Sequence, residues 1–209
     1  MPPIVSELIK FTLAHGFKLD SPVFAQLRNV AVANGVKEQY YGTCTDTPNT
    51  LFWVIRPLES PVFRNAVKAL DVEGKPENYY LPFAHDSLPR PLSLPSVRAC
   101  EPSHCVASSS LTDPLQCFLH IKSTADQKSL AYSLNKTFTD CYYAEGFTGG
   151  HWSTASNDDK MNYYYLGWES RDFHRAFTKT DLFALELNNL MPHRDGGGAN
   201  FMKMTQQLN

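Results

Sequence analysis

Histidine and tyrosine are the residues of this chain best suited to moving a proton near neutral pH. Two of the seven histidines, His120 and His151, fall within predicted strands. An imidazole titrates near neutral pH, so either side chain could act as a general base. Tyr163, Tyr164 and Tyr165 form a run in another predicted strand, and a tyrosine hydroxyl can donate to a developing oxyanion. We therefore take His120, His151, Tyr164 and Tyr165 as candidate catalytic residues, with core packing as the alternative.

The other polar residues give weaker signals. His174 is expected to lie exposed on a helix beside Arg175. Cys100 and Cys105 flank His104, but a zinc site needs four ligands and no second half-site appears. The sequence contains no Gly-x-Ser-x-Gly, His-Glu-x-x-His, Cys-x-x-Cys or P-loop motif, and no histidine stands out as a haem ligand. We expect no metal, haem, flavin or nicotinamide cofactor.

The composition argues against several classes of protein. Charged residues make up 19% of the chain and the net charge is −2, so a nucleic-acid partner is not expected. No run approaches the roughly 18 apolar residues of a membrane span, and the N-terminus lacks the pattern of a signal peptide. The five cysteines are irregularly spaced, which favours free thiols and a cytoplasmic location. The aromatic content of 12% can fill a core or line a pocket for a flat apolar substrate.

The chain contains an internal repeat. Shifting the sequence by 110 positions (118 − 8) aligns residues 8–67 with the second half without a gap. Leu58-Glu59-Ser60 then lies over Trp168-Glu169-Ser170. At this offset the tyrosine run of the second half lies over Trp53-Val54-Ile55, which carries no hydroxyl. The repeat therefore predicts that any chemistry belongs to the second half.

Each repeat reads as a βαββαβ unit. Ser21-Pro22 and Ser60-Pro61 are good helix starts, since serine caps the first turn and proline fits its first position. The fourth strands are expected at 96–100 and 200–204. The proline-rich segment 76–95 is predicted to be a loop, because proline excludes regular helix or sheet. Gly196-Gly197-Gly198 is assigned a matching loop in the second half.

These elements predict an α+β fold made of two tandem ferredoxin-like repeats. A βαββαβ unit carries both helices on one face of its sheet, so the bare apolar face must be covered. Two units can pack sheet against sheet as a pseudo-dimeric α+β barrel. We place the first repeat at residues 1–100, a linker at 101–114 and the second repeat at 115–209. The chain would be a monomeric pseudo-dimer or a homodimer.

Three segments resemble a known family. The strand Glu7–Leu13, the segment Gln39-Tyr40-Tyr41-Gly42 and the run from Asn49 to Val54 are similar to those of antibiotic-biosynthesis-monooxygenase-like dimeric α/β barrels. The two-copy form resembles fungal proteins of that type. The resemblance implies a cofactor-independent tailoring enzyme of polyketide-like or aromatic secondary metabolites, with proton abstraction driving cyclisation or rearrangement. Cofactor-free monooxygenation of phenols is one alternative, and a non-catalytic small-molecule-binding or stress-associated barrel is the other, because a fold does not fix a function.

Overall fold

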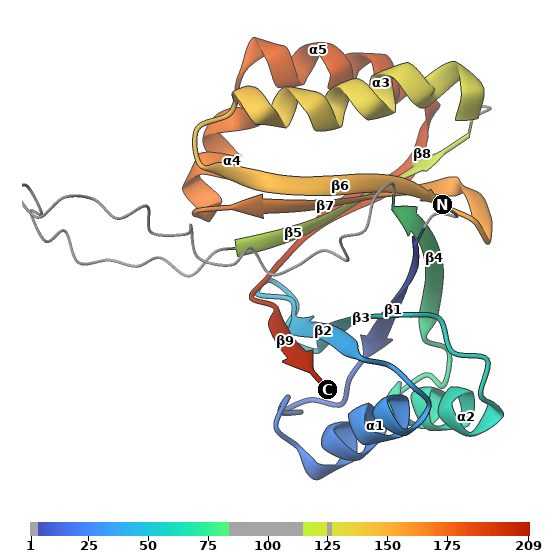
Figure 1. Ribbon diagram of the computed structural model, residues 1–209. Coiled ribbons are helices and arrows are strands. Elements are labelled where there is room, and N and C mark those ends of the chain that lie inside the picture. The colour runs from blue at the N-terminus through green and yellow to red at the C-terminus, as the bar shows by residue number, and fades with distance from the viewer. Residues whose placement is uncertain (1–3, 84–114, 125–126) are drawn as a thin grey trace, which may run out of the picture.

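The computed structural model describes residues 4–83, 115–124 and 127–209, which form two antiparallel sheets with helices on their outer faces (Figure 1). The first sheet has the strand order β4 (Glu77–Phe83), β1 (Ile4–Thr12), β3 (Thr50–Ile55), β2 (Glu38–Thr43) and β9 (Thr205–Leu208). The second has the order β6 (Phe147–Ala155), β7 (Asp158–Trp168), β5 (Leu115–Ser123) and β8 (Arg194–Met202).

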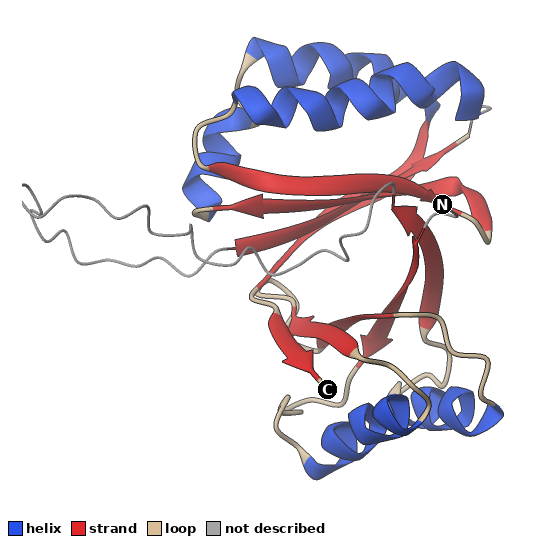
Figure 2. Cartoon of the chain, in the orientation of Figure 1, coloured by secondary structure: helices blue, strands red, loops and turns tan. Residues whose placement is uncertain are grey.

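The helices lie in two layers, one outside each sheet (Figure 2). Helices α1 (Pro22–Ala33) and α2 (Pro61–Leu70) cover the first sheet. The second sheet is covered by α3 (Gln127–Thr139), α4 (Arg171–Phe177) and α5 (Asp181–Leu190), with the short 3-10 helices η1 (Asp140–Tyr143) and η2 (Met191–His193). No helix within the described ranges is long and apolar enough to cross a membrane.

The predicted tandem α+β architecture is confirmed. Within each half the fourth strand pairs with the first, the first with the third, and the third with the second. The first half therefore reads β4-β1-β3-β2 and the second β8-β5-β7-β6, which is the same order. Serine caps the corresponding helices α2 and α4 in the two copies, where Ser60 accepts from the Phe63 amide and Ser170 from the Phe173 amide.

Two seams join the sheets into a barrel. At one seam the Ser156 amide donates to the Tyr80 carbonyl at 2.8 Å, which links β4 to the turn after β6. At the other, the Thr45 amide donates to the Phe201 carbonyl at 2.7 Å. Beyond that point the chain crosses to the first sheet, where β9 pairs with β2. Each half thus closes the other, as two subunits of a dimer would.

The apolar residues separate into three cores. One core lies between the sheets and takes residues from both halves, including Phe52 and Phe118, whose stacked rings are 5.4 Å apart. A second core fills the space between the first sheet and its helices, around Trp53 and Phe24. The third lies between the second sheet and its helices and includes Trp168. The central strands β1, β3 and β7 therefore have two buried faces, one toward the barrel interior and one toward the helices.

The predictions for the fourth strands were wrong in part. The first of these strands is β4, inside the proline-rich segment predicted to be a loop. Pro82 is tolerated because β4 ends its sheet in the hydrogen-bonding order, where a missing amide donor costs least. Gly196–Gly198 is not a loop either, because it lies within β8 opposite His120–Lys122. Residues 96–100 and 101–114 lie outside the described residues.

The gapless alignment also needs one correction. In the first half Lys10 pairs with Phe52, whereas in the second half His120, at the matching position, pairs with Tyr163. The second and third strands therefore correspond at an offset of 111 (163 − 52), while the first strands and the capped helices keep 110. Because side chains alternate along a strand, this slip changes which residues share a face.

Candidate active site

The four residues predicted from the sequence do not converge on one site. Phe118 and Tyr163 belong to the core between the sheets, and alternation places His120 and Tyr165 on that same barrel face. Tyr164 points the opposite way, into the core beneath the helices. The residues therefore divide between two faces of one sheet, and we describe each face in turn.

On the barrel face, His120 lies beside a tyrosine as expected, and that tyrosine is Tyr163. Their ring centroids are 5.7 Å apart. Burial lowers the pKa of His120, and the positive charge of Lys10 lowers it further, while Glu77 acts in the opposite direction. Tyr79 completes the group, because its hydroxyl donates to Glu77 at 3.0 Å and its ring lies 4.9 Å from that of Tyr163. This cluster joins the two halves at the barrel interior.

His151 is separated from His120. It lies on β6 and pairs with Tyr165 of β7, whereas His120 lies on β5 and pairs with Tyr163 of β7. The histidines are thus two strand spacings and two residue steps apart, with β7 between their strands, which corresponds to roughly 12 Å. Burial raises the pKa of the Tyr165 hydroxyl. At this separation the two histidines cannot both contact the same reacting atom of a bound molecule.

Tyr164 is the predicted residue that faces the helices. Its side chain is buried, and its hydroxyl donates to the Leu134 carbonyl of α3 at 2.9 Å. The hydroxyl proton is therefore engaged in holding α3 on the sheet. Burial raises the pKa of Tyr164 well above its ordinary value, so the residue stays neutral.

The helix side of the second sheet contains a cavity whose lining includes the predicted residue His120, although most of its lining residues were not indicated by any sequence motif. It has a volume of about 230 Å³ and lies between α4, α5 and the strands β5 and β8. We call it the inner cavity. Its wall is mainly apolar, from Leu119 on β5, Ala199 on β8 and Leu187 and Leu190 on α5. Ala199, which pairs with Leu119 on this face of the sheet, leaves the space open, because a larger side chain there would fill it.

His174 is the titratable side chain on the α4 wall of the inner cavity. The expectation that it is exposed was wrong, since it is 9% exposed. Its ring packs edge-to-face against Trp168 and Phe201, with centroid distances of 5.2 Å and 4.9 Å. Burial, followed by the positive charges of Arg171 and Arg175, lowers the pKa of His174 to about 4. The imidazole is therefore neutral at pH 7.

Neither ring nitrogen of His174 is hydrogen-bonded within the part of the chain that the structure describes. The surrounding aromatic contacts fix the plane of the ring without using its nitrogens. A neutral imidazole nitrogen that is held in place, lines an apolar cavity and has no partner can accept a proton from a bound molecule.

The first half fills the corresponding place with an ion pair. At the 110 offset, His174 corresponds to Arg64. The same offset matches Cys117 with Glu7. Their partners on the fourth strands, Phe201 and Tyr80, therefore also correspond. Glu7 is completely buried, and the Arg64 guanidinium donates hydrogen bonds to both of its carboxylate oxygens, one of them at 3.0 Å. Arg64 also donates to the Tyr80 hydroxyl at 3.3 Å. Charge and hydrogen bonds thus hold α2 on its sheet, where the second half has a neutral histidine facing a cavity.

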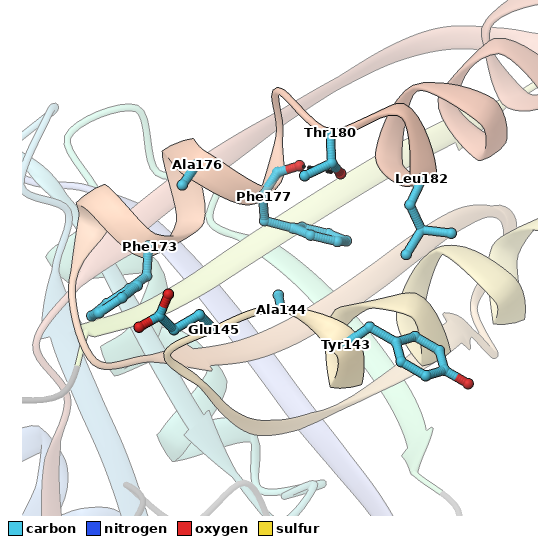
Figure 3. Close-up of a pocket in the computed structure, with 8 residues that line it drawn as sticks. All are labelled: Tyr143, Ala144, Glu145, Phe173, Ala176, Phe177, Thr180 and Leu182. Atoms are coloured by element: carbon cyan, nitrogen blue, oxygen red, sulfur yellow. Dashed lines mark hydrogen bonds between the residues drawn. The ribbon is translucent and has the colours of Figure 1, made fainter.

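Two further cavities adjoin the same helices. Figure 3 shows the outer cavity, of about 230 Å³, which opens between the end of η1 and helices α4 and α5. Its lining includes Tyr143, Glu145, Ala176, Phe177 and Leu182. A small cavity of about 10 Å³ lies deeper. Phe177 lines both the outer and the small cavity, while His174 lines both the small and the inner one.

The described side chains give no indication of a metal centre. No group of three or more histidine, cysteine, aspartate or glutamate side chains among them could hold a metal ion. Cys141 and Cys117 lie near the helix-side cavities as free thiols, and burial raises the pKa of both, that of Cys141 to about 12. Each thiol therefore stays protonated and unreactive at neutral pH.

Comparison with known structures agrees with the fold. The chain is similar to a candidate monooxygenase from Lactobacillus acidophilus, with a TM-score of 0.61, 10% identity, and coverage of 100% of this chain and 97% of that one. A candidate monooxygenase from Fusobacterium nucleatum gives a TM-score of 0.63 at 8% identity, covering 100% and 95%. An anthrone oxidase-like protein gives 0.64 at 12% identity, covering 98% and 92%. No protein-family model and no curated protein matches the chain.

These matches show a shared fold over both halves. The three structures match this chain over nearly its whole length, so the arrangement of both halves is matched together. At such low identity the comparison identifies no functional residue. The candidate site therefore depends on the geometry around His174.

Proposed function

We propose that this chain is a tailoring enzyme that oxidises an aromatic, polyketide-like substrate with dioxygen and without a bound cofactor. In this proposal the inner cavity holds the reacting part of the substrate, and His174 is the general base. One observation carries the proposal: a neutral, unpartnered imidazole faces an apolar cavity in the second half, where the first half has a buried ion pair. The names of the structural neighbours, candidate monooxygenases and an anthrone oxidase-like protein, support the same chemistry.

A suitable substrate has a methylene group activated by flanking aromatic rings and a carbonyl, as anthrones do. His174 would remove one proton from this carbon, and the resulting anion would be stabilised by delocalisation into the rings. The negative charge of the anion would raise the pKa of the imidazolium formed beside it, which offsets the weak basicity of His174 in the empty cavity. An apolar cavity also favours a delocalised anion over a small, strongly hydrated one.

The oxidation balances without another reductant. The substrate anion transfers one electron to dioxygen, and the two radicals combine to form a carbon–oxygen bond. The peroxide anion takes back the proton held by His174. Loss of water then leaves a ketone, so that the methylene and dioxygen give a carbonyl and water. The protein supplies the base, the orientation and the exclusion of water.

Oxygen uptake and quinone formation from 1,8-dihydroxyanthrone, measured above the rate without enzyme, would test the proposal. We expect His174→Gln to lower turnover about a hundredfold or more, as removal of a general base does. His193→Gln is the matched control, because His193 is an exposed histidine on η2. The acid limb of the kcat/KM profile is expected near pH 4, the pKa of His174 in the free protein.

Other outcomes would identify the remaining possibilities. Full activity in His174→Gln combined with a large loss in His120→Gln would refute the site and move it to the barrel face. A product of unchanged mass would show cyclisation or rearrangement, which shares the proton abstraction but not the reaction with dioxygen. Tight binding with no turnover would favour a non-catalytic small-molecule-binding protein.

A further inference from the structure

The helix layer of the second half contains three cavities in a row. The outer cavity and the small cavity share Phe177 as a common wall. The small cavity and the inner cavity share Leu119, His174 and Phe183. Along this row, Phe177 stands between the outer and small cavities, and His174 stands between the small and inner ones. Figure 3 shows the Phe177 ring among the residues of the outer cavity, opposite Ala144 and Leu182.

The size of each cavity argues for joint use. Cavities that bind organic ligands usually measure roughly 300–1,000 Å³. The inner and outer cavities are each about 230 Å³, below that range, whereas the two together lie within it. A single phenol ring fits the inner cavity, whereas a polycyclic molecule is larger than that cavity and extends beyond it.

Phe177 is well placed to separate or join them. It is the last residue of the short helix α4. Its ring is held by aromatic contacts, at centroid distances of 5.8 Å from Trp168 and 5.6 Å from Phe183. A planar aromatic ligand can replace such contacts when the ring turns aside, so opening is compatible with retained stacking. The first half has the smaller Val67 at the matching helix position.

We propose that the outer cavity is a second subsite of the same binding site, which holds the distal rings of an elongated polycyclic aromatic substrate after Phe177 turns aside. The apolar walls formed by Phe173 and Leu182 would contact the ring faces. The Glu145 carboxylate, at the outer end, would accept hydrogen bonds from phenolic hydroxyl groups. The inference rests on the proposed function for the nature of the substrate, but it concerns binding alone.

Binding of 1,8-dihydroxyanthraquinone and of phenol to the full chain, measured by calorimetry, would test this subsite. Ala176 is exposed at the edge of the outer cavity, so Ala176→Phe fills that cavity with little effect on the core. We expect this variant to bind the tricyclic quinone about tenfold more weakly or worse, and phenol unchanged. The matched control is Ala66→Phe, at the same position of α2 in the first half, which should bind both compounds as the unaltered chain does.

Phe177→Ala provides the second measurement. By removing the separating ring it should strengthen binding of the tricyclic quinone relative to phenol. Unchanged quinone binding in Ala176→Phe would overturn the proposal, as would an equal loss for both compounds or no binding of the quinone to the unaltered chain. Because these measurements need no turnover, a chain that binds the quinone across both cavities but oxidises nothing would refute the proposed reaction and leave the subsite standing.

Discussion

Replacement of His174 by phenylalanine should remove a specific sensitivity of this protein to acid. The folded state holds His174 neutral with a pKa of about 4, whereas the same side chain in the unfolded chain has its ordinary value of 6.5. Between these values the unfolded chain binds a proton that the folded chain does not. The free energy of unfolding should therefore fall as the pH is lowered from about 6.5 to about 4, and it should recover when the pH is raised.

The magnitude follows from the two pKa values. At roughly 1.4 kcal/mol for each pH unit, the full difference between 6.5 and about 4 is about 3 kcal/mol. At pH 5, between the two values, about 2 kcal/mol of this loss should already be present. His174 is nearly fully buried, so screening by solvent should not reduce the effect greatly.

The assay is urea-induced unfolding of the full chain at pH 7.5 and pH 5. The free energy of unfolding of the unaltered protein should drop between these conditions by about 2 kcal/mol more than that of His174→Phe. Phenylalanine preserves the edge-to-face contacts with Trp168 and Phe201, so the variant should fold. His193→Gln, which removes an exposed histidine, should behave like the unaltered protein. An identical pH dependence in His174→Phe and the unaltered chain would refute the idea that folding keeps this imidazole neutral.

Three further substitutions test the packing that shapes the site. Arg64→Met should lower the free energy of unfolding in urea by about 3–5 kcal/mol, because it leaves the Glu7 carboxylate buried without its partner. Adding Glu7→Leu to this variant should restore much of the lost stability. Gly150→Ala should greatly lower the yield of folded protein, since the new methyl would lie 2.2 Å from the Tyr165 carbonyl oxygen, and normal circular dichroism and melting would contradict that contact. Ser170→Ala should cost about 1 kcal/mol by removing the cap of α4, and a loss matching that of Arg64→Met would show a role beyond capping.

Local signals explain how much of the fold the sequence predicted. Apolar strand-length runs and serine caps located the first three strands of each half and several helix starts, because these signals depend on neighbouring residues alone. The fourth strands depend on tertiary context instead. Pro82 fits a strand only because β4 occupies an edge, and the Gly196–Gly198 run becomes β8 only because β5 offers a partner. Composition alone could not distinguish these strands from loops.

The site was harder to predict because the choice of histidine depended on side-chain direction. His120 and His151 were selected for lying on strands, and both do, but their rings face the barrel. His174 was set aside because Arg175 follows it, although adjacent helix residues face different directions. One signal could have identified it. Glu7 is a charge within an apolar strand that needs a partner, and its partner Arg64 aligns with His174.

The asymmetry between the halves makes physical sense if one cavity is kept open for a ligand. The inner cavity opens to solvent beside the exposed Ala199, so apolar surface on its wall stays unpacked and contributes less burial free energy than a filled site would. The net stability of a protein is only about 5–15 kcal/mol, so leaving such surface unpacked in one half costs less than leaving it in both. Fusion of the two halves into one chain lets them differ. Glu7, Arg64 and Tyr80 hold α2 to its sheet in the first half, and the second half can then keep open space beside His174 for a ligand that stabilises it on binding.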